Sequence, residues 1–189
     1  MRKLHHLLGC TLLAGVIVTA SALPLLVGEV DATVSLPFGG EAEMEAGKDV
    51  LVVFAGFPGC SDICPTTLSY LSRVHEKVDD PRLAVAFLNI LFDTPEQESR
   101  DYARAFNPDF IAYSPDISAQ QALYQQMGLL GSTERSEVAN HSGNTFVYQR
   151  SGGQWLLQRV YAVLPQEAGM ASDIQEILMK NLPGSNERA

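Results

Sequence analysis

The sequence predicts an α/β domain with a central mixed sheet and flanking helices, preceded by one N-terminal hydrophobic segment. Three observations support this fold class. Two short apolar runs rich in β-branched residues, 50–55 and 83–91, are each followed by a stretch with helical periodicity. Two further apolar runs flank Arg150-Ser-Gly-Gly153, as in a β-hairpin. With 189 residues, 46% of them hydrophobic, the chain is long enough to bury one sizeable core.

The sequence of the N-terminus predicts that the chain is exported or inserted into a membrane. Arg2 and Lys3 precede an almost uninterrupted apolar run from Leu7 to Val27, which just reaches the roughly 20 residues that a spanning helix needs. Ala20-Ser21-Ala22 also matches a signal-peptide cleavage site. The apolar run continues past that site, which favours an anchor over a removed signal peptide. In both cases the basic residues stay in the cytoplasm, so the domain is expected on the extracytoplasmic (periplasmic) side of the membrane.

These features divide the chain into three parts. A signal anchor or signal peptide is expected at 1–28, a linker at 29–33, and a single domain at 34–189. Cys10 lies at the start of the apolar run, whereas a lipid-modified cysteine would follow it. We therefore interpret Cys10 as a small apolar residue of the membrane segment.

The first strand and helix of the domain are expected between residues 50 and 78. Residues 50–55 (VLVVFA) form an unbroken apolar run, as in a strand that is buried on both faces of a sheet. After Pro65, apolar side chains recur at helical spacing, which predicts an amphipathic helix whose N-terminus lies at Cys64-Pro65. Its inner face is expected to comprise Leu68, Leu71, Val74 and Val78.

A second strand and helix follow. Residues 83–91 predict another buried strand. Asp93 is expected to cap the next helix, with Pro95 at an early helical position and Glu96 in an acidic first turn. The inner face of this helix is expected to comprise Tyr102, Ala105 and Phe106.

In the rest of the domain, the sequence predicts one more short strand, a helix, a loop, a hairpin and a closing helix. In order, these are residues 110–112, 115–127, 128–140, the strands 144–148 and 155–160, and a helix from Pro165 onward. The resulting order β-α-β-α-β-α-β-β-α is the one that a thioredoxin-like sheet requires, although it also fits other mixed α/β sheets.

Two cysteines add weight to the thioredoxin-like alternative. Cys60 and Cys64 fall in the first βα turn, at the carboxyl end of a buried strand, where open α/β sheets place their functional sites. Because Cys64 lies beside a helix N-terminus, its thiolate is expected to form more readily than that of an ordinary cysteine. Asp62 is interpreted as a turn residue that faces solvent or accepts a backbone N–H, rather than as a metal ligand.

Three roles are open to the pair. A structural disulfide between residues only four apart would remove little unfolded-state entropy and so would stabilise the fold little. A thioredoxin-type redox pair has two intervening residues, and the third residue between Cys60 and Cys64 loosens the geometry for fast exchange. A metal site is the third role, and it needs a further ligand.

His141 is the candidate third ligand. It lies just before the first hairpin strand, in a loop that would face the first βα turn in a thioredoxin-like arrangement. Two thiolates and one imidazole suit copper, especially Cu(I), whereas structural zinc would need a fourth ligand that the sequence does not identify. His75, on the first helix, is interpreted as simply exposed.

Four stretches of the chain, in order, resemble the Sco/SenC family of copper-binding proteins. They are Leu51–Leu68 with its C-x-x-x-C-P motif, Asp93–Glu96, Ala105–Ile111, and Asn140–Ser142 before a strand. The resemblance spans most of the exported domain and implies a thioredoxin-like fold and a membrane tether. It also implies copper bound by two cysteines and a histidine, which match Cys60, Cys64 and His141. Family members help to assemble the binuclear copper centre of cytochrome c oxidase, as copper donors or as thiol-disulfide reductants of its cysteines.

The chain departs from the family pattern at four points. Ser35–Asp49 is short where the family has a longer hairpin, so an edge strand is expected to be missing. The loop Asn89–Asp93 after the second strand is also shortened. Gly59 stands where a histidine or similar residue often precedes the first cysteine, and Asn140 stands where an aspartate is common before His141. These differences leave the three ligands intact, but they bear on the residues around the ligands, on the metal affinity and on the identity of the target.

The leading hypothesis is a copper-binding accessory protein, or metallochaperone, that delivers copper to the copper centre of cytochrome c oxidase or prepares that centre. Its partner would be the copper-receiving subunit of the oxidase or another copper protein. The rival hypothesis is a thiol-disulfide oxidoreductase that uses Cys60 and Cys64 to reduce a partner's cysteines without metal. A peroxidase is disfavoured because no Thr-x-x-Cys pattern surrounds either cysteine. The net charge of -9 argues against nucleic acid as a partner.

Overall fold

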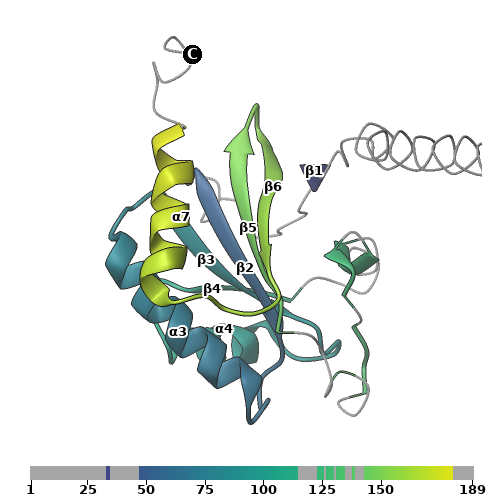
Figure 1. The fold of residues 1–189 in the computed structure, drawn as a ribbon. Helices are drawn as coiled ribbons and strands as arrows, with labels where there is room; N and C mark the ends of the chain where they lie inside the picture. The colour runs from purple at the N-terminus through teal and green to yellow at the C-terminus, as the bar shows by residue number, and fades with distance from the viewer. Residues whose placement is uncertain are drawn as a thin grey trace, which may run out of the picture. The chain divides into compact units, whose positions relative to one another are not determined.

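Six strands form one mixed sheet in the order β1-β6-β5-β2-β3-β4 (Figure 1). The computed structural model describes residues 33–34, 47–114, 123–125, 127–129, 131–134, 138 and 143–180. The strands are β1 (Thr33–Val34), β2 (Val50–Gly56), β3 (Leu83–Asn89), β4 (Ile111–Tyr113), β5 (Thr145–Ser151) and β6 (Gln154–Tyr161). The helices are α3 (Ile63–Val78), α4 (Glu96–Arg104) and α7 (Glu167–Lys180).

Strand β2 lies in the middle of the sheet. It pairs in parallel with β3 and antiparallel with β5, and every residue of β2 and β3 is buried. A strand that is flanked and covered in this way favours apolar side chains, which explains the run VLVVFAG. The predicted first and second strands are therefore confirmed, although β3 ends at Asn89 rather than at residue 91.

Helices α3 and α7 pack side by side on one face of the sheet (Figure 1). The four apolar residues that the sequence assigned to the inner face of α3 are all buried: Leu68, Leu71, Val74 and Val78. The helix begins at Ile63, one residue before the expected N-terminus. Cys64 therefore lies inside the first turn of α3 rather than ahead of it.

Helix α4 differs from the expectation at both ends. Its N-cap is Pro95, and Asp93 does not cap it because Asp93 adopts a left-handed backbone conformation with φ 66°. The Thr94 hydroxyl instead donates to the carbonyl of Leu91 at 2.9 Å, which closes the turn before the helix. Because the helix ends at Arg104, Ala105 lies beyond it and is exposed. The buried residues of α4 are Ser99 and Ala103, while Tyr102 and Phe106 are half-buried.

The C-terminal half follows the predicted order where it is described. Strand β4 confirms the third short strand, and residues 123–125 and Met127 are helical, as expected for the end of the helix predicted at 115–127. Strands β5 and β6 form the predicted antiparallel hairpin, and both are longer than expected. Gly152 and Gly153 make its turn with φ 58° and 81°. Helix α7 closes the domain as predicted.

The N-terminal edge of the sheet corrects one expectation. A short edge strand is present, because Thr33 and Val34 pair antiparallel with Leu156 and Trp155 of β6. Thr33 is also the last residue of the expected linker. The expected membrane segment at 1–28 lies outside the described residues. Among the residues that are described, no helix is both long enough and apolar enough to cross a membrane.

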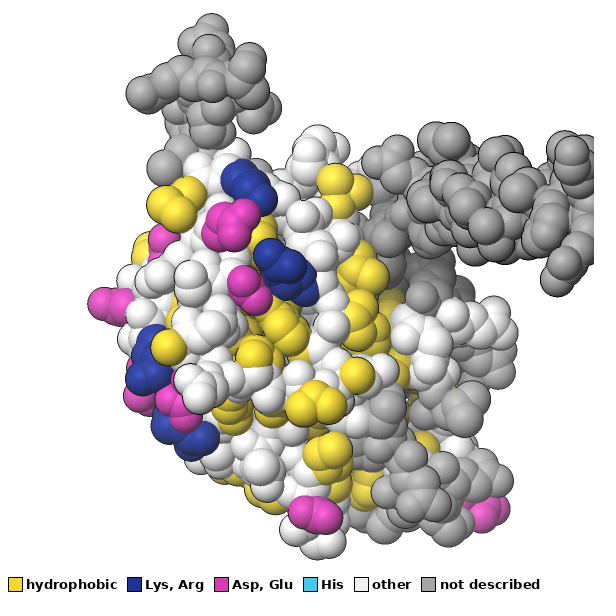
Figure 2. Space-filling model, viewed as in Figure 1, with side chains coloured by type: hydrophobic (Ala, Val, Ile, Leu, Met, Phe, Trp, Pro, Cys, Tyr) yellow, Lys and Arg dark blue, Asp and Glu magenta, His cyan; other side chains and the backbone are white. Residues whose placement is uncertain are grey.

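The face that carries α7 and the hairpin exposes apolar side chains between charged ones (Figure 2). Val160, Val163 and Met179 are among the large apolar residues that are exposed. Ion pairs connect the elements of this face: Arg159 of β6 contacts Asp173 of α7, and Arg73 of α3 contacts Glu167 of α7. These ion pairs join α7 to the hairpin and to the middle of α3.

Candidate thiol site

The two cysteines lie in the turn that connects β2 to α3. The backbone N–H of Cys60 donates to the carbonyl of Phe57 at 3.2 Å, which closes a tight turn. Gly59 adopts φ 80° within this turn, a conformation that residues with a side chain rarely take. The glycine that directly precedes the first cysteine is thus required by the backbone of this chain.

Cys60 and Cys64 are both reduced thiols outside any disulfide. The Cys64 thiol donates a hydrogen bond to the sulfur of Cys60. The two side chains differ in exposure: Cys64 is fully buried, whereas Cys60 is half-buried. The turn therefore brings both sulfurs to one point, with one sulfur facing inward and the other reachable from solvent.

The environments of the two sulfurs shift their pKa values in opposite directions. Partial burial opposes ionisation of Cys60. Hydrogen bonds from the Cys64 thiol and from the backbone N–H groups of Asp62, Cys64 and Ile63 outweigh that burial and lower the Cys60 pKa. Burial raises the pKa of Cys64, and the hydrogen bond that Cys64 donates to Cys60 raises it further.

The expectation that Cys64 would ionise readily is therefore wrong. Cys64 does lie at a helix N-terminus, but it occupies the inner side of the first turn, where burial and the hydrogen bond to Cys60 raise its pKa. The benefit of the N-terminal N–H groups goes to Cys60 instead, because Cys60 precedes the helix and accepts from those groups.

Two glycines allow the first turn of α3 to approach the sheet closely. A Cβ atom on Gly56 would lie 2.7 Å from Cys64 Sγ and 3.0 Å from the ring of Phe87. A Cβ atom on Gly143, just before β5, would overlap the side chain of Ile63. Gly56 and Gly143 together form what we call the glycine notch, and Cys64 and Ile63 sit over it.

A tyrosine from α4 completes the surroundings of the thiols. The Tyr102 hydroxyl donates to the carbonyl oxygen of Cys60 at 3.4 Å. Burial, together with the negative charges that Cys64 and Cys60 carry when ionised, raises the pKa of Tyr102 to about 12. The sequence assigned Tyr102 only to the inner face of a helix. No local pattern connects it to a cysteine 42 residues away.

Of the predicted site residues, the structure brings Cys60 and Cys64 together, and His141 lies outside the described residues. Asp62 is exposed at the N-cap of α3 and makes no side-chain capping bond, which agrees with a solvent-facing turn residue. Within the described part of the chain, no three side chains of histidine, cysteine, aspartate or glutamate are grouped as a metal site.

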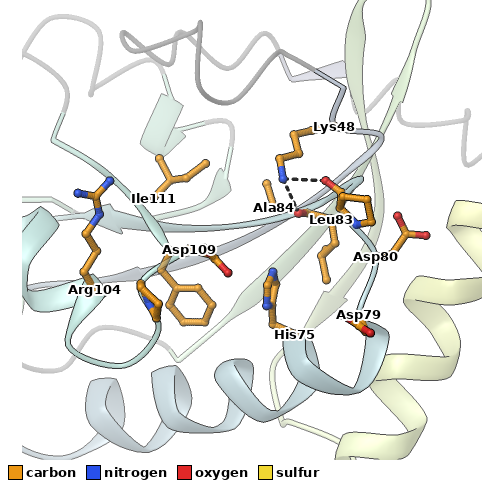
Figure 3. Close-up of a pocket in the computed structure, with 12 residues that line it drawn as sticks. Lys48, His75, Asp79, Asp80, Leu83, Ala84, Arg104, Asp109 and Ile111 are labelled. Carbon is orange, nitrogen blue, oxygen red and sulfur yellow. Dashed lines mark hydrogen bonds between the residues drawn. The ribbon is translucent and has the colours of Figure 1, made fainter.

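His75 differs from its interpretation as an exposed histidine. It is half-buried, and its ring meets Phe110 edge to face at 6.1 Å. Burial lowers its pKa. His75 faces a cavity of about 510 Å³ that also contacts Lys48, Arg104 and Asp109 (Figure 3).

This cavity lies far from the thiols. His75 follows Cys64 by 11 positions on α3, which corresponds to about 16 Å along a helix axis. Lys48 at its edge donates to the carbonyls of Pro81 and Leu83 at 2.7 and 3.1 Å, and so ties the chain before β2 to the start of β3 (Figure 3). The residues that line the cavity do not include Cys60 or Cys64, so the cavity is separate from the thiol site.

Comparison with known proteins identifies relatives that match about half of the chain. A protein from Stutzerimonas stutzeri named "Putative copper-binding protein" is 31% identical over 102 residues, which are 49% of this chain and 50% of the relative. The chain thus spans about half the length of the curated relatives that it matches.

Solved structures share the fold. Copper-bound ScoI from Arabidopsis thaliana matches with a TM-score of 0.60 at 16% identity, over 71% of this chain and 86% of that one. A putative thioredoxin from Neisseria meningitidis matches with a TM-score of 0.52 at 14% identity, over 85% and 99%. The fold is therefore thioredoxin-like. The family model described as SCO1/SenC matches residues 41–179, which is well over half of the sequence, and the chain belongs to that family.

Proposed function

We propose that this chain binds copper as cargo through the thiolates of Cys60 and Cys64 and the imidazole of His141. The observation that carries this proposal is the pair of reduced thiols that are hydrogen-bonded to each other at the start of α3. Thiolate sulfur is a soft ligand that selects Cu(I), and an imidazole would complete a three-ligand site. The name of the S. stutzeri relative supports the same metal.

Chain connectivity supports His141 as the third ligand. His141 precedes Gly143 by two residues, and Gly143 lies against Ile63, the neighbour of Cys64. Two residues of extended chain span at most about 7 Å, so the His141 backbone is tethered within that distance of Gly143. This tether would leave an imidazole within reach of the thiol turn.

The two sulfurs would contribute differently to copper binding and release. The raised pKa of Cys64 means that its proton must leave when the metal binds, so affinity should fall as the pH falls. Cys60 is the sulfur that solvent reaches, so a ligand from a receiving protein would enter beside it. We place this transfer outside the cytoplasm, with the copper-receiving subunit of cytochrome c oxidase as the proposed partner.

Copper binding can be tested with three variants of the full chain. We expect the reduced wild-type protein to bind about one Cu(I), and the double variant Cys60→Ala, Cys64→Ala to lose this binding. His141→Ala should weaken Cu(I) binding at least tenfold in competition with a chromogenic chelator. His75→Ala is the matched control. It removes a histidine from α3, the helix that carries Cys64, at a distance from the thiols. Undiminished binding by the double variant would rule out this site.

A second function, thiol-disulfide exchange, is favoured by the asymmetry of the two sulfurs. Cys60 is accessible with a lowered pKa, and Cys64 is buried with a raised pKa, as in an attacking and a resolving thiol. The Cys60 thiolate would attack a partner disulfide and release one partner thiolate. Cys64, after losing its proton, would then attack the Cys60 sulfur of this mixed disulfide and release the second partner thiolate. The partner would gain two electrons and become a dithiol, while Cys60 and Cys64 would form a disulfide.

His141 separates the two functions. A copper donor should lose most of its activity in His141→Ala, whereas a pure dithiol reductant should keep it. The measurement is reduction of a disulfide-containing acceptor in metal-free buffer, run beside copper transfer to the same acceptor after it has been reduced. Loss of both activities in His141→Ala would argue against a reductant that works independently of the metal site.

A further inference from the structure

Tyr102 connects helix α4 to the thiol turn. Its hydroxyl donates to the carbonyl of Cys60 at 3.4 Å, across 42 residues of sequence. Cys60 itself is only half-buried and belongs to a short turn rather than to a strand or helix. A side-chain donor from another element can therefore influence where this turn places the sulfur of Cys60.

The ring of Tyr102 is held on two sides. Its centroid lies 5.5 Å from the ring of Phe87 in β3 and 5.5 Å from the ring of Phe106, with interplanar angles of 49° and 72°. Phe87 also lines the glycine notch beneath Cys64, because it would meet a Cβ atom on Gly56 at 3.0 Å. The hydroxyl is thus presented from a packed aromatic cluster that contacts the surroundings of both sulfurs.

A tyrosine phenol keeps its proton across the physiological range and so can donate a hydrogen bond at neutral pH. It therefore remains a hydrogen-bond donor while the thiols ionise or bind a ligand. The backbone N–H groups of Asp62, Ile63 and Cys64 point at the Cys60 sulfur only while the turn keeps its shape. Besides the Cys60 to Phe57 bond, the Tyr102 contact is a second hydrogen bond that holds this turn.

We infer that Tyr102 is a positioning residue, whose hydroxyl holds the main chain of Cys60 so that the sulfurs of Cys60 and Cys64 converge on one metal ion. This inference rests on the proposed function for its consequence in copper binding. Its structural part, the anchoring of the turn, concerns the metal-free protein and can be tested separately.

The test compares Tyr102→Phe with the wild-type full chain in two measurements. The substitution keeps the ring and its packing and removes only the hydroxyl. In the reduced, metal-free protein, amide hydrogen exchange at Asp62, Ile63 and Cys64 should become about three- to tenfold faster, which corresponds to the loss of one hydrogen bond. Exchange in β2 and β3 should stay unchanged. The Cu(I) affinity, measured by competition with a chromogenic chelator, should fall by a similar factor.

Tyr161→Phe is the matched control, because it removes the hydroxyl of another half-buried tyrosine whose bond goes to Asp173 on α7. It should change neither measurement at the thiol turn. Unchanged exchange in Tyr102→Phe, or faster exchange throughout the sheet, would overturn the anchoring role. Faster exchange confined to the turn with unaltered Cu(I) affinity would overturn the role in metal binding. If the wild-type chain binds no Cu(I), the proposed function fails, and the exchange data still decide whether Tyr102 anchors Cys60.

Discussion

At the scale of single residues, the two sulfurs of the site differ in exposure and in the direction of their pKa shifts. Cys60 has a lowered pKa and is partly exposed, so at a given pH it holds more reactive thiolate than an ordinary cysteine. Burial raises the pKa of Cys64 and shields it from reagents. In reduced, metal-free protein, iodoacetamide should therefore modify Cys60 first, and peptide mass mapping should find little adduct at Cys64.

The pH dependence of this reaction follows from the direction of the shift. Because the pKa of Cys60 is lowered from its ordinary value of 9.0, its rate of alkylation should rise with pH and reach half its maximum below pH 9.0. In denaturant both cysteines should react at similar rates, since the environments that distinguish them are gone. Equal labelling of Cys60 and Cys64 in the native protein would contradict the asymmetry.

Gly56 is the residue on which the position of Cys64 depends. Gly56→Ala would place a methyl group 2.7 Å from Cys64 Sγ and against the rings of Phe87 and Phe54, so the first turn of α3 must shift. We expect a loss of about 1–3 kcal/mol in the free energy of unfolding, as for other overpacked cores, measured by urea denaturation.

Gly169→Ala is the opposite case and serves as the control. Gly169 lies in α7, and the nearest atom to an added Cβ is 3.9 Å away. Alanine is the better helix former there by about 0.5–1 kcal/mol, so this variant should be as stable as the wild type or more stable. If both variants lost stability to the same extent, steric conflict at the glycine notch would not be the cause.

At the scale of elements, the hairpin β5–β6 depends on the turn at Gly152 and Gly153. Both residues have positive φ, 58° and 81°, as a type I′ turn requires. An added Cβ meets no atom within 4 Å at either position, so the backbone conformation alone decides the effect of a substitution. Gly153→Ala should cost about 1–2 kcal/mol of unfolding free energy, because alanine is strained in the left-handed region.

Gly152→Asn tests the same turn with a residue that tolerates it. Asparagine adopts positive φ readily and is favoured at the first position of such turns, so we expect little change in stability. Urea denaturation of both variants gives the comparison. A similar loss of stability in Gly152→Asn would mean that the turn requires glycine for a reason other than its backbone angles.

Elements whose signal is local were predictable from the sequence. The signal of the buried strands β2 and β3 is an unbroken apolar run. The signal of α3 is a set of apolar residues at helical spacing, and that of the hairpin is a pair of glycines between two strands. The prediction that Asp93 caps α4 was wrong, because a residue can cap a helix only if its backbone adopts suitable angles. The left-handed conformation of Asp93 leaves Pro95 as the N-cap of α4.

At the scale of the whole molecule, the parts of the site that the sequence did not predict arise from contacts between distant segments. The burial of Cys64 depends on Gly56 in the preceding strand, and the contact of Tyr102 with Cys60 joins α4 to the thiol turn. His75 is half-buried because Phe110, from beyond α4, packs against its ring. Periodicity within one segment carries no information about such contacts, whereas the Cys spacing and its place after β2 identified the thiol pair itself.

The stability of the whole domain should report on copper binding. A ligand that binds only the native state stabilises it by about 2.7 kcal/mol at a free concentration of 100 times the dissociation constant. For a domain of this size, such a gain raises the melting temperature by roughly 5–10 °C. Under the proposed function, adding Cu(I) to the reduced full chain should produce this shift in thermal unfolding followed by circular dichroism. The double variant Cys60→Ala, Cys64→Ala should show none, and His75→Ala should behave as the wild type does. An equal shift in the double variant would locate the copper at other groups and contradict the proposed copper site.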